Sequence, residues 1–426
     1  MQKKLLILPF FIGIIFAEDL NEKKSIEFIF GKPKSTIISK QYGNILDKNF
    51  TIVPKYHTKN RNIELKVLPY ISDNNFIFKE LYLGYSFKKN SVILGRFITN
   101  NSSSNELISS GSMVMSNNTL PIPRIGFRTK NNLFKITYSF EIYHGIMEKN
   151  ENINKAPFLH EKKLYLKKSF DKSSSISLGI HHAAIWAGST IKHGLQPSSF
   201  LDFVDVFLAD KSREGVGNIA DQGNSLGDSR GMWDLSYNKE INEQKYKIYY
   251  QIFFEDKSGL KLKNNVSNFD GLYGIEIKSS KFIFLYEYLK TTYQGGNVHP
   301  PGIDSYYVNG TYAPGWLYKN FSIGNSFINP FNNRAKINHI FLKRNFNYNS
   351  FFIDYSFGKH YLPYIYKEYN ETLIFDNDKG KRFSEIVFGY DRNLNSNLNI
   401  KLFFEKTIDT KSVFLSLVYN INNSKQ

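Results

Sequence analysis

Apolar and polar side chains alternate along most of this chain, from about residue 50 to the C-terminus. In the segment 134–142, the apolar positions are Phe134, Ile136, Tyr138, Phe140 and Ile142, and polar residues occupy the positions between them. Side chains of a β-strand point alternately to its two faces, so this period of two predicts strands with one apolar and one polar face. The pattern recurs in further segments: 81–87, 176–180, 246–254, 282–288, 400–404 and 413–419.

The length and number of these segments favour one β architecture. Strands of about 9 to 11 residues, rich in tyrosine and phenylalanine, are typical of a transmembrane β-barrel with its apolar side toward lipid. A secreted array of β-sandwich domains is the alternative, but it divides into domains of about 100 residues joined by linkers. No linker rich in proline, serine or glycine is visible in the sequence. We therefore predict an all-β fold, a transmembrane antiparallel β-barrel.

Short turns and long inserts separate the predicted strands. The turns are clusters such as 88–90, 130–132 and 171–174, and the inserts occupy 99–120, 147–157, 187–230, 257–268, 291–335 and 359–381. Short periplasmic turns and long extracellular loops are the asymmetry of an outer-membrane barrel. At roughly 23 residues per strand and connection, we expect about 18 strands, within an even count of about 16 to 18.

The first residues are predicted to be a cleaved secretory signal. Two lysines precede an apolar stretch over 5–16, and Ala17 follows it. The stretch is shorter than the about 20 residues of a spanning helix, and a proline and a glycine interrupt it. An N-terminal anchor helix is the alternative. The predicted organisation is a signal peptide over 1–17, a short periplasmic segment over 18–48 and the barrel over 49–426.

Composition narrows the classes of partner. An aromatic content of 16% with a mean hydropathy of −0.37 fits a lipid-facing band diluted by polar lumen and loop residues. The chain has no cysteine, which excludes disulfides and cysteine-ligated metals. The net charge is +17. If the basic residues cluster in the lumen or at its mouth, they favour acidic glycans or lipopolysaccharide as partners. If the lysines are instead spread evenly over the loops, the net charge predicts no particular partner. The lysines form no helical basic stripe, so nucleic-acid binding is not expected.

Four groups of motifs follow one another in the middle of the chain. They are 93–97 with 109–112 and 117–125; 178–188; 223–228 with 231–235; and 309–318 running to 323–325. Together, over roughly 50–345, they resemble the Wzi-like capsule assembly family of outer-membrane proteins. The resemblance implies an outer-membrane β-barrel with a helical element on the periplasmic side. It also implies a lectin-like role, in which acidic or neutral capsular polysaccharide is held at the cell surface rather than solutes being conducted.

Two features of the sequence depart from that family pattern. Residues 18–48 are lysine-rich and show little amphipathic helical pattern, so a substantial periplasmic helical bundle is not expected. The chain also continues to Gln426, so Tyr419, the aromatic typical of a barrel assembly signal, is not at the extreme end.

Aromatic and arginine side chains in or near the motifs form the candidate glycan site. Aromatic faces stack on the C–H surfaces of sugars, and guanidinium groups pair with the carboxylates of acidic sugars. All three tryptophans lie in motifs that also contain glycine. The predicted glycan-binding residues are Trp186, Trp233, Trp316, Tyr306, Tyr307, Tyr312, Tyr318, Arg124, Arg213, Arg230 and His181. The competing interpretation is an aromatic girdle at the membrane interface together with side chains that pack loops.

The pair His181 and His182 does not predict a catalytic or metal site. Adjacent strand residues point to opposite faces, so we expect His181 in the lumen and His182 on the lipid side. No nucleophile elbow, HExxH or EF-hand spacing occurs in the sequence. We therefore predict no enzymatic activity, no metal and no cofactor.

The predicted function is an outer-membrane barrel that binds or anchors capsular polysaccharide or exopolysaccharide at the cell surface. The alternative is a porin or substrate-specific channel whose basic lumen selects anions. The expected partners are surface polysaccharide, outer-membrane lipid and lipopolysaccharide, and the barrel assembly machinery, with the barrel itself a monomer.

Overall fold

The structure, a computed structural model, describes residues 22–46, 48–73, 75–99, 102–261, 270–294, 305–361 and 380–421. Its main sheet contains 18 strands. They are β1 (Glu22–Phe30), β2 (Phe50–Lys59), β3 (Ile63–Ser72), β4 (Asn75–Phe87), β5 (Asn90–Arg96), β6 (Arg124–Leu133), β7 (Ile136–Ile146), β9 (Phe158–Ser169), β10 (Ser174–Trp186), β13 (Asp228–Ile241), β14 (Gln244–Phe254), β15 (Gly271–Lys278), β16 (Phe282–Lys290), β19 (Arg334–Asn345), β20 (Asn349–Tyr361), β21 (Gly380–Asn393), β22 (Leu398–Thr407) and β23 (Lys411–Ile421).

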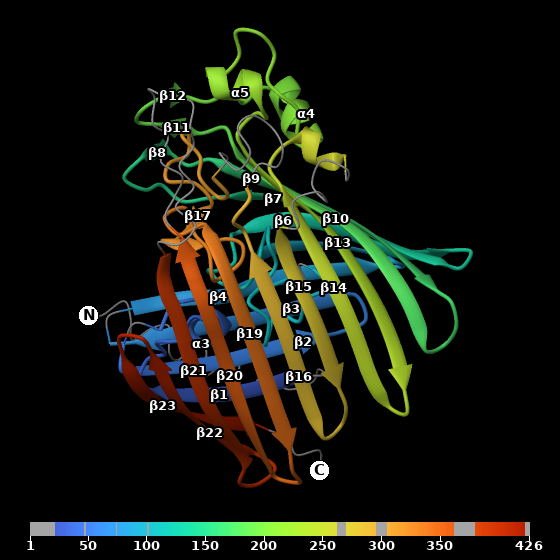
Figure 1. Ribbon diagram of the computed structural model, residues 1–426, viewed down its shortest axis with the longest axis vertical. Helices are drawn as coiled ribbons and strands as arrows, with labels where there is room; N and C mark the ends of the chain where they lie inside the picture. Colours follow the sequence, from blue (N-terminus) through green and yellow to red (C-terminus); the bar gives the residue numbers. More distant parts are fainter. Residues whose placement is uncertain are drawn as a thin grey trace.

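These strands form a closed barrel (Figure 1). Each strand pairs in antiparallel register with its neighbours in the chain, and β1 pairs with β23 along Lys24 to Phe30, which closes the sheet. Closure gives both edges of the sheet a hydrogen-bonding partner. The predicted fold class and strand count are therefore confirmed.

Short and long connections lie at opposite ends of the barrel. Turns such as 60–62, 88–89, 134–135 and 242–243 join strands at one end. The strand ends joined by the long connections 97–123, 147–157, 187–227, 255–270 and 291–333 all lie at the other end, and the last predicted insert falls largely outside the described residues. These connections match the predicted inserts closely. By the asymmetry of outer-membrane barrels, the long-loop end faces the cell exterior.

Smaller elements occur within the long connections. They are α3 (Thr36–Gln41), β8 (Ile153–Lys155), β11 (Ser189–Thr190), β12 (Gly194–Leu195), α4 (Phe200–Leu208), α5 (Ile219–Gly223), the 3-10 helix η1 (Lys257–Leu260), β17 (Leu317–Tyr318) and β18 (Phe321–Ser322). None of the helices in the described part of the chain combines the length and apolar character needed to cross a membrane.

The outward face of the barrel is apolar along neighbouring strands. Leu83 pairs with Leu94, and Leu94 pairs in turn with Ile125; all three side chains are exposed. On the other side of the barrel, Ile353 pairs with Phe388 and Phe388 with Phe404. Leu83 and Phe404 lie in segments whose alternation predicted a lipid-facing side, and their neighbours on the adjacent strands extend the same apolar surface.

The strand phase can be tested at Phe140, in the middle of β7. Phe140 pairs with the outward-facing Leu164, so Phe140→Arg would put a charge on the lipid-facing surface. We expect a loss of about 2 to 4 kcal/mol in the free energy of folding into lipid vesicles, measured by urea titration. Phe134→Arg is the matched control, because Phe134 is fully exposed in a short turn. Equal stability of the two variants would contradict the phase.

The barrel begins one strand earlier than the predicted boundary at residue 49. Residues 22–30, placed in a periplasmic segment over 18–48, form β1 and pair with both β2 and β23. Charged residues fill the first half of β1, so only Ile26 to Phe30 carries a visible alternation. The predicted signal peptide, residues 1–17, lies outside the described residues.

The connection between β1 and β2 enters the lumen instead of extending into the periplasm. Ile38 of α3 packs with Phe403 and Phe414 on the inner wall. The backbone nitrogen of Thr36 donates to Glu385 at 2.9 Å, and the Ser35 hydroxyl donates to Glu405 at 3.0 Å. A short helix within the barrel therefore takes the place of the predicted periplasmic segment.

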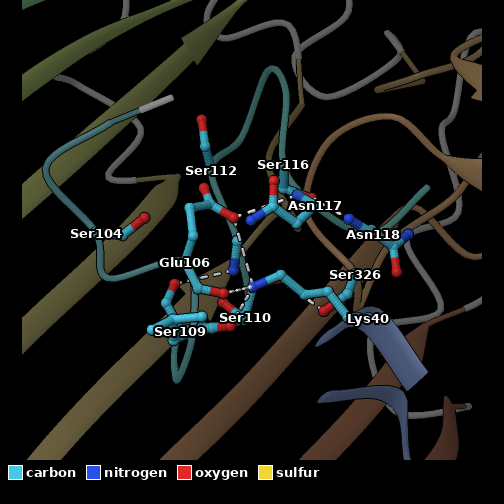
Figure 2. A network of polar contacts seen from close by, with 12 residues as sticks. Lys40, Ser104, Glu106, Ser109, Ser110, Ser112, Ser116, Asn117, Asn118 and Ser326 are labelled. Atoms are coloured by element: carbon cyan, nitrogen blue, oxygen red, sulfur yellow. Dashed lines mark hydrogen bonds and ion pairs between the residues drawn. The ribbon is translucent and has the colours of Figure 1, made fainter. Parts of the chain in front are cut away.

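The long connection 97–123 also lies in the lumen, where it contacts neighbouring strands of the wall. Asn105 donates to Glu276 of β15 at 3.2 Å, and the Ser109 hydroxyl donates to Glu287 of β16 at 2.7 Å. The Lys40 ammonium of α3 donates to the carbonyl oxygens of Ser109 and Glu106 at 2.7 and 2.9 Å (Figure 2). Loop 97–123 and α3 are thus joined, and with residues 305–333 they form a plug that fills the lumen; we refer to these segments as the plug.

Charged side chains of both signs occupy the polar positions of the inner wall. Its carboxylates include Glu27, Glu80, Glu141, Glu161, Asp234, Glu276, Glu287, Asp354, Glu385 and Glu405. Its cations include Lys66, Arg124, Lys163, Lys247 and Lys343, each of which pairs with a carboxylate of the wall. The inner-wall carboxylates therefore accept hydrogen bonds from the plug or pair with lysine, arginine and histidine of the wall.

Candidate functional site

The tyrosines and tryptophan of the fourth motif lie inside the plug. Trp316 is completely buried, and its indole nitrogen donates to the carbonyl oxygen of Val114 at 2.7 Å. Tyr307 donates to the carbonyl oxygen of Met113, and Tyr312 donates to that of Ala187 at 2.9 Å. Trp316 and Tyr307 thus hold the 305–333 connection against loop 97–123, and Tyr312 holds it against the 187–227 connection. As placed, they offer no face to a ligand outside the barrel.

Tyr318 is also buried, at the edge of the plug. Its hydroxyl lies 3.0 Å from Glu148 and 3.3 Å from Arg96, and its carbonyl oxygen accepts from Thr119 at 2.8 Å. The nearby Lys319 also forms an ion pair with Glu148. Tyr318 therefore connects three long connections at the extracellular end.

The other two tryptophans point outward from the wall. Trp233 pairs with Ile180 and Ile252 on the lipid-facing side, and its indole nitrogen donates to Gly259 of η1 at 3.3 Å. Trp186 also faces outward, where it packs against Phe203 of α4 with ring centres 5.5 Å apart. Both positions are those of the aromatic girdle considered as the alternative. The alternation in the sequence shows that a strand has two faces. It does not show which face a tryptophan occupies where the strand end is irregular.

The three predicted arginines already have carboxylate partners within the protein. Arg124 pairs with Glu161 and Arg213 with Asp202. Arg230 pairs with Asp228 at 2.5 Å and also with Glu255. Arg124 and Arg230 are buried, whereas the Arg213 side chain is exposed. Pairing partners far apart in sequence, such as Arg124 and Glu161, cannot be recognised from spacing.

His181 faces the lumen as expected and belongs to a buried charge cluster. Its Nε2 atom lies 3.1 Å from Glu161, which also contacts Lys163 at 3.0 Å and Arg124. His182 faces outward, where its Nε2 atom lies 2.9 Å from the Ser229 hydroxyl. No group of three or more metal-ligating side chains occurs in the residues that the structure covers.

A cavity of about 870 Å³ lies at the extracellular rim. Its walls come from three connections, namely 187–227 with α5, residues 255–259 with Asp270, and 306–311, above the ends of β13 and β14. Two predicted residues, Arg230 and Tyr306, line it. The exposed Lys192, His193 and Asn224 also line it, so the cavity can be reached from outside. We refer to it as the rim cavity.

Most of the polar lining of the rim cavity was not predicted. Carboxylates and amides line it, among them Asp221, Asp256, Asp270, Asn218 and Asn309. Burial raises the pKa of the Asp270 carboxyl to about 6, against the opposing effects of the Tyr293 backbone and Lys290. The cavity therefore loses one negative charge as the pH falls through that value. Motifs at 223–228 and 309–318 marked two of its walls, whereas the third wall fell at a predicted insert, 257–268, in which no motif was recognised.

The motifs meet in space although they lie far apart in the chain. Asn325 of the fourth group donates to Ser110 at 3.0 Å and to Gly111 at 2.7 Å, both in the first group. Asn309 donates to the carbonyl oxygen of Gly227 of the third group at 3.5 Å. Gly111 has φ of +100°, and a Cβ atom there would lie 2.7 Å from Ser116, so only glycine fits this turn. The motif set therefore builds the plug and the rim.

The fold and the filled lumen define an outer-membrane β-barrel with a plug and an extracellular rim site. The chain belongs to the capsule assembly protein Wzi family, whose sequence profile matches residues 33–346. No curated protein sequence matches the chain.

Several solved structures resemble the chain to different degrees. Wzi of Escherichia coli, described as a carbohydrate-binding β-barrel involved in group 1 capsule assembly, has a TM-score of 0.63 at 13% identity, covering 99% of this chain and 88% of that one. OccK10 of Pseudomonas aeruginosa gives a TM-score of 0.47 at 9% identity, covering 95% and 99%. OprD of the same organism gives 0.43 at 11% identity, covering 96% and 95%. The likeness to Wzi shows the barrel fold.

Proposed function

We propose that this protein holds surface polysaccharide at the outer membrane and that the rim cavity is its glycan-binding site. Membership in the capsule assembly family and the fold it shares with a carbohydrate-binding barrel support the function. The observation that carries the site is a cavity of about 870 Å³ reachable from outside and set above a filled lumen.

The lining of the rim cavity suits sugar hydroxyls better than sugar carboxylates. Carboxylate and amide side chains accept and donate hydrogen bonds to hydroxyls. The Arg230 guanidinium already pairs with Asp228 and Glu255, and Lys192 is the other permanent cation in the lining. A largely neutral polysaccharide is therefore the proposed ligand. Of the predicted glycan-binding residues, Arg230 and Tyr306 are retained in this proposal.

The role proposed is binding without catalysis. Purified protein should retain polysaccharide without releasing new reducing ends, and deletion of the protein should loosen the polysaccharide from the cell surface. The channel alternative is not adopted, because the plug occupies the lumen. Outer-membrane lipid, lipopolysaccharide and the barrel assembly machinery remain proposed partners of a monomeric barrel.

Gly310 offers a direct way to fill the rim cavity. It lines the cavity, and a Cβ atom built there meets nothing within 4 Å, so a larger side chain would extend into open space. We expect Gly310→Trp to weaken binding of the strain's own polysaccharide at least tenfold, equivalent to about 1.4 kcal/mol, in a titration with purified protein.

Gly223→Trp is the matched control for that experiment. Gly223 also has no atom within 4 Å of an added Cβ, but it does not line the rim cavity. We expect its affinity for polysaccharide to equal that of the unchanged protein. Equal affinity of both variants would place the glycan elsewhere on the loops, whereas absence of binding by the unchanged protein would reject the function itself.

A further inference from the structure

Helix α4 has an apolar surface on both of its sides. One side packs on the barrel: Phe203 lies 5.5 Å from Trp186 and Phe207 lies 5.4 Å from His160, measured between ring centres. The other side is exposed, at 77% for Phe200, 57% for Leu201 and 49% for Leu208. An apolar face of a helix is usually buried, so the exposed apolar side needs an explanation.

The exposed apolar residues and the half-buried Val204 form one continuous stripe. At 3.6 residues per turn, Phe200, Leu201, Val204 and Leu208 fall within an arc of about 100°. The acidic residues of the helix lie outside that arc, where Asp202 caps the helix at Ser199 and pairs with Arg213. Positive and negative groups are therefore kept away from the stripe.

Helix α4 lies on the outer surface of the wall rather than above the lumen. On β9, the outward positions beyond the exposed Leu164 are Lys162 and His160, because Glu161 and Lys163 face the lumen. The Lys162 ammonium lies 4.1 Å from the centre of the Phe207 ring. Two residues along a strand span about 7 Å. Helix α4 therefore begins to cover the wall at Lys162, about 7 Å beyond the lipid-facing Leu164 toward the long-loop end. Figure 1 shows α4 near the long-loop ends of β9 and β10.

We propose that the stripe of Phe200, Leu201, Val204 and Leu208 docks into the outer leaflet of the membrane. Lipid is the occupant because the stripe continues the lipid-facing surface of β9 and β10 outward, with Trp186 at the same level in the position of an interfacial aromatic. Interfacial helices bury an apolar face into the boundary between headgroups and acyl chains in the same way.

Docking of α4 has a consequence for the rim cavity. The connection 187–227, which contains α4, also supplies Lys192, His193 and α5 to the cavity wall. A membrane anchor in the middle of this connection would hold that wall in place from outside. The inference does not depend on glycan binding, because it rests on the exposed stripe and its position alone.

The absence of cysteine in the chain makes a site-directed label the natural test. A nitroxide spin label is attached to Leu201→Cys in the full-length barrel reconstituted into phospholipid vesicles, and its collision rates with oxygen and with a water-soluble nickel chelate are measured. We expect the ratio of oxygen to nickel accessibility to be several-fold higher than for a label at Glu214→Cys, an exposed position in the same connection. Phe140→Cys on β7 supplies the value for a position in lipid.

Two results would overturn the proposal. A label at Leu201 with the nickel accessibility of the Glu214 label would place the stripe in water. Dipolar broadening between labels on different molecules would show that a second copy of the chain covers it. Val204→Cys, on the same stripe, repeats the measurement if Leu201→Cys does not fold. In detergent-solubilised protein, the difference in the oxygen-to-nickel ratio between each stripe label and the Glu214 label should be smaller.

Discussion

Replacing Glu161 with alanine is expected to lower the free energy of unfolding of the barrel by about 3 to 5 kcal/mol. Glu161 is fully buried on the inner wall and contacts Arg124, Lys163 and His181. Its removal leaves buried cations without their shared carboxylate, which costs more than the loss of the ion pairs themselves. Lys163 keeps a contact of 3.4 Å with Glu141, so the loss falls mainly on Arg124.

The measurement is urea-induced unfolding in lipid vesicles, followed by the loss of heat-resistant migration on gels. Glu214→Ala serves as the control, since Glu214 is exposed in a loop and should change stability little. Glu161→Gln should fall between the two, because an amide keeps part of the hydrogen bonding but no charge. A Glu161→Ala variant as stable as the control would mean that water replaces the carboxylate in the cluster.

Replacing Trp316 with alanine is expected to open the lumen while the wall stays closed. Trp316 has no exposed surface and packs in the cluster that joins loop 97–123 to residues 305–333. Truncation of a buried tryptophan costs about 3 to 5 kcal/mol, and here the cost falls on the plug rather than on the strand pairing. We therefore expect steady conductance in planar bilayers where the unchanged protein has none.

Trp233→Ala is the matched control for this prediction. It removes the same side chain type from the outer face of the wall, away from the plug. Its conductance should equal that of the unchanged protein. Conductance in the unchanged protein would contradict the filled lumen, and a closed Trp316→Ala barrel would show that the rest of the plug holds without this side chain.

The alternation of side chains was sufficient to predict the barrel because it reports directly on the wall. Leu83, Leu94 and Ile125 lie on the same face of three neighbouring strands. Contact with lipid accounts for the apolar character of all three positions. The count of about 18 strands came from the chain length at roughly 23 residues per strand and connection, and the long connections are the places where the alternation stops. The strand-like piece from Ile26 to Phe30 was left outside the barrel, because charges at the start of β1 shorten the visible alternation.

The content of the lumen could not be predicted from the sequence. A polar residue at an inward-facing position gives the same sequence pattern whether water or a loop contacts it. Glu276 and Glu287 occupy ordinary inward positions in the sequence, yet they accept hydrogen bonds from Asn105 and Ser109 of a distant connection. Trp316 and Tyr307 were predicted for their aromatic faces, which the plug uses for packing. Whether an aromatic side chain faces a sugar or a neighbouring loop depends on tertiary contacts alone.

The plug also constrains the order in which the protein assembles. Glu385 and Glu405, near the end of the chain, find partners in residues 34–36, directly after the first strand. Glu287, from the middle, accepts from Ser109 in the loop between the fifth and sixth strands, in addition to its contacts with Tyr249 and His339 of the wall. A hollow cylinder of these strands would therefore enclose carboxylates that lack part of their hydrogen bonds, an unfavourable intermediate. Membrane insertion and internal packing should accordingly proceed as one cooperative event, with the lumen filled before the seam between β1 and β23 closes.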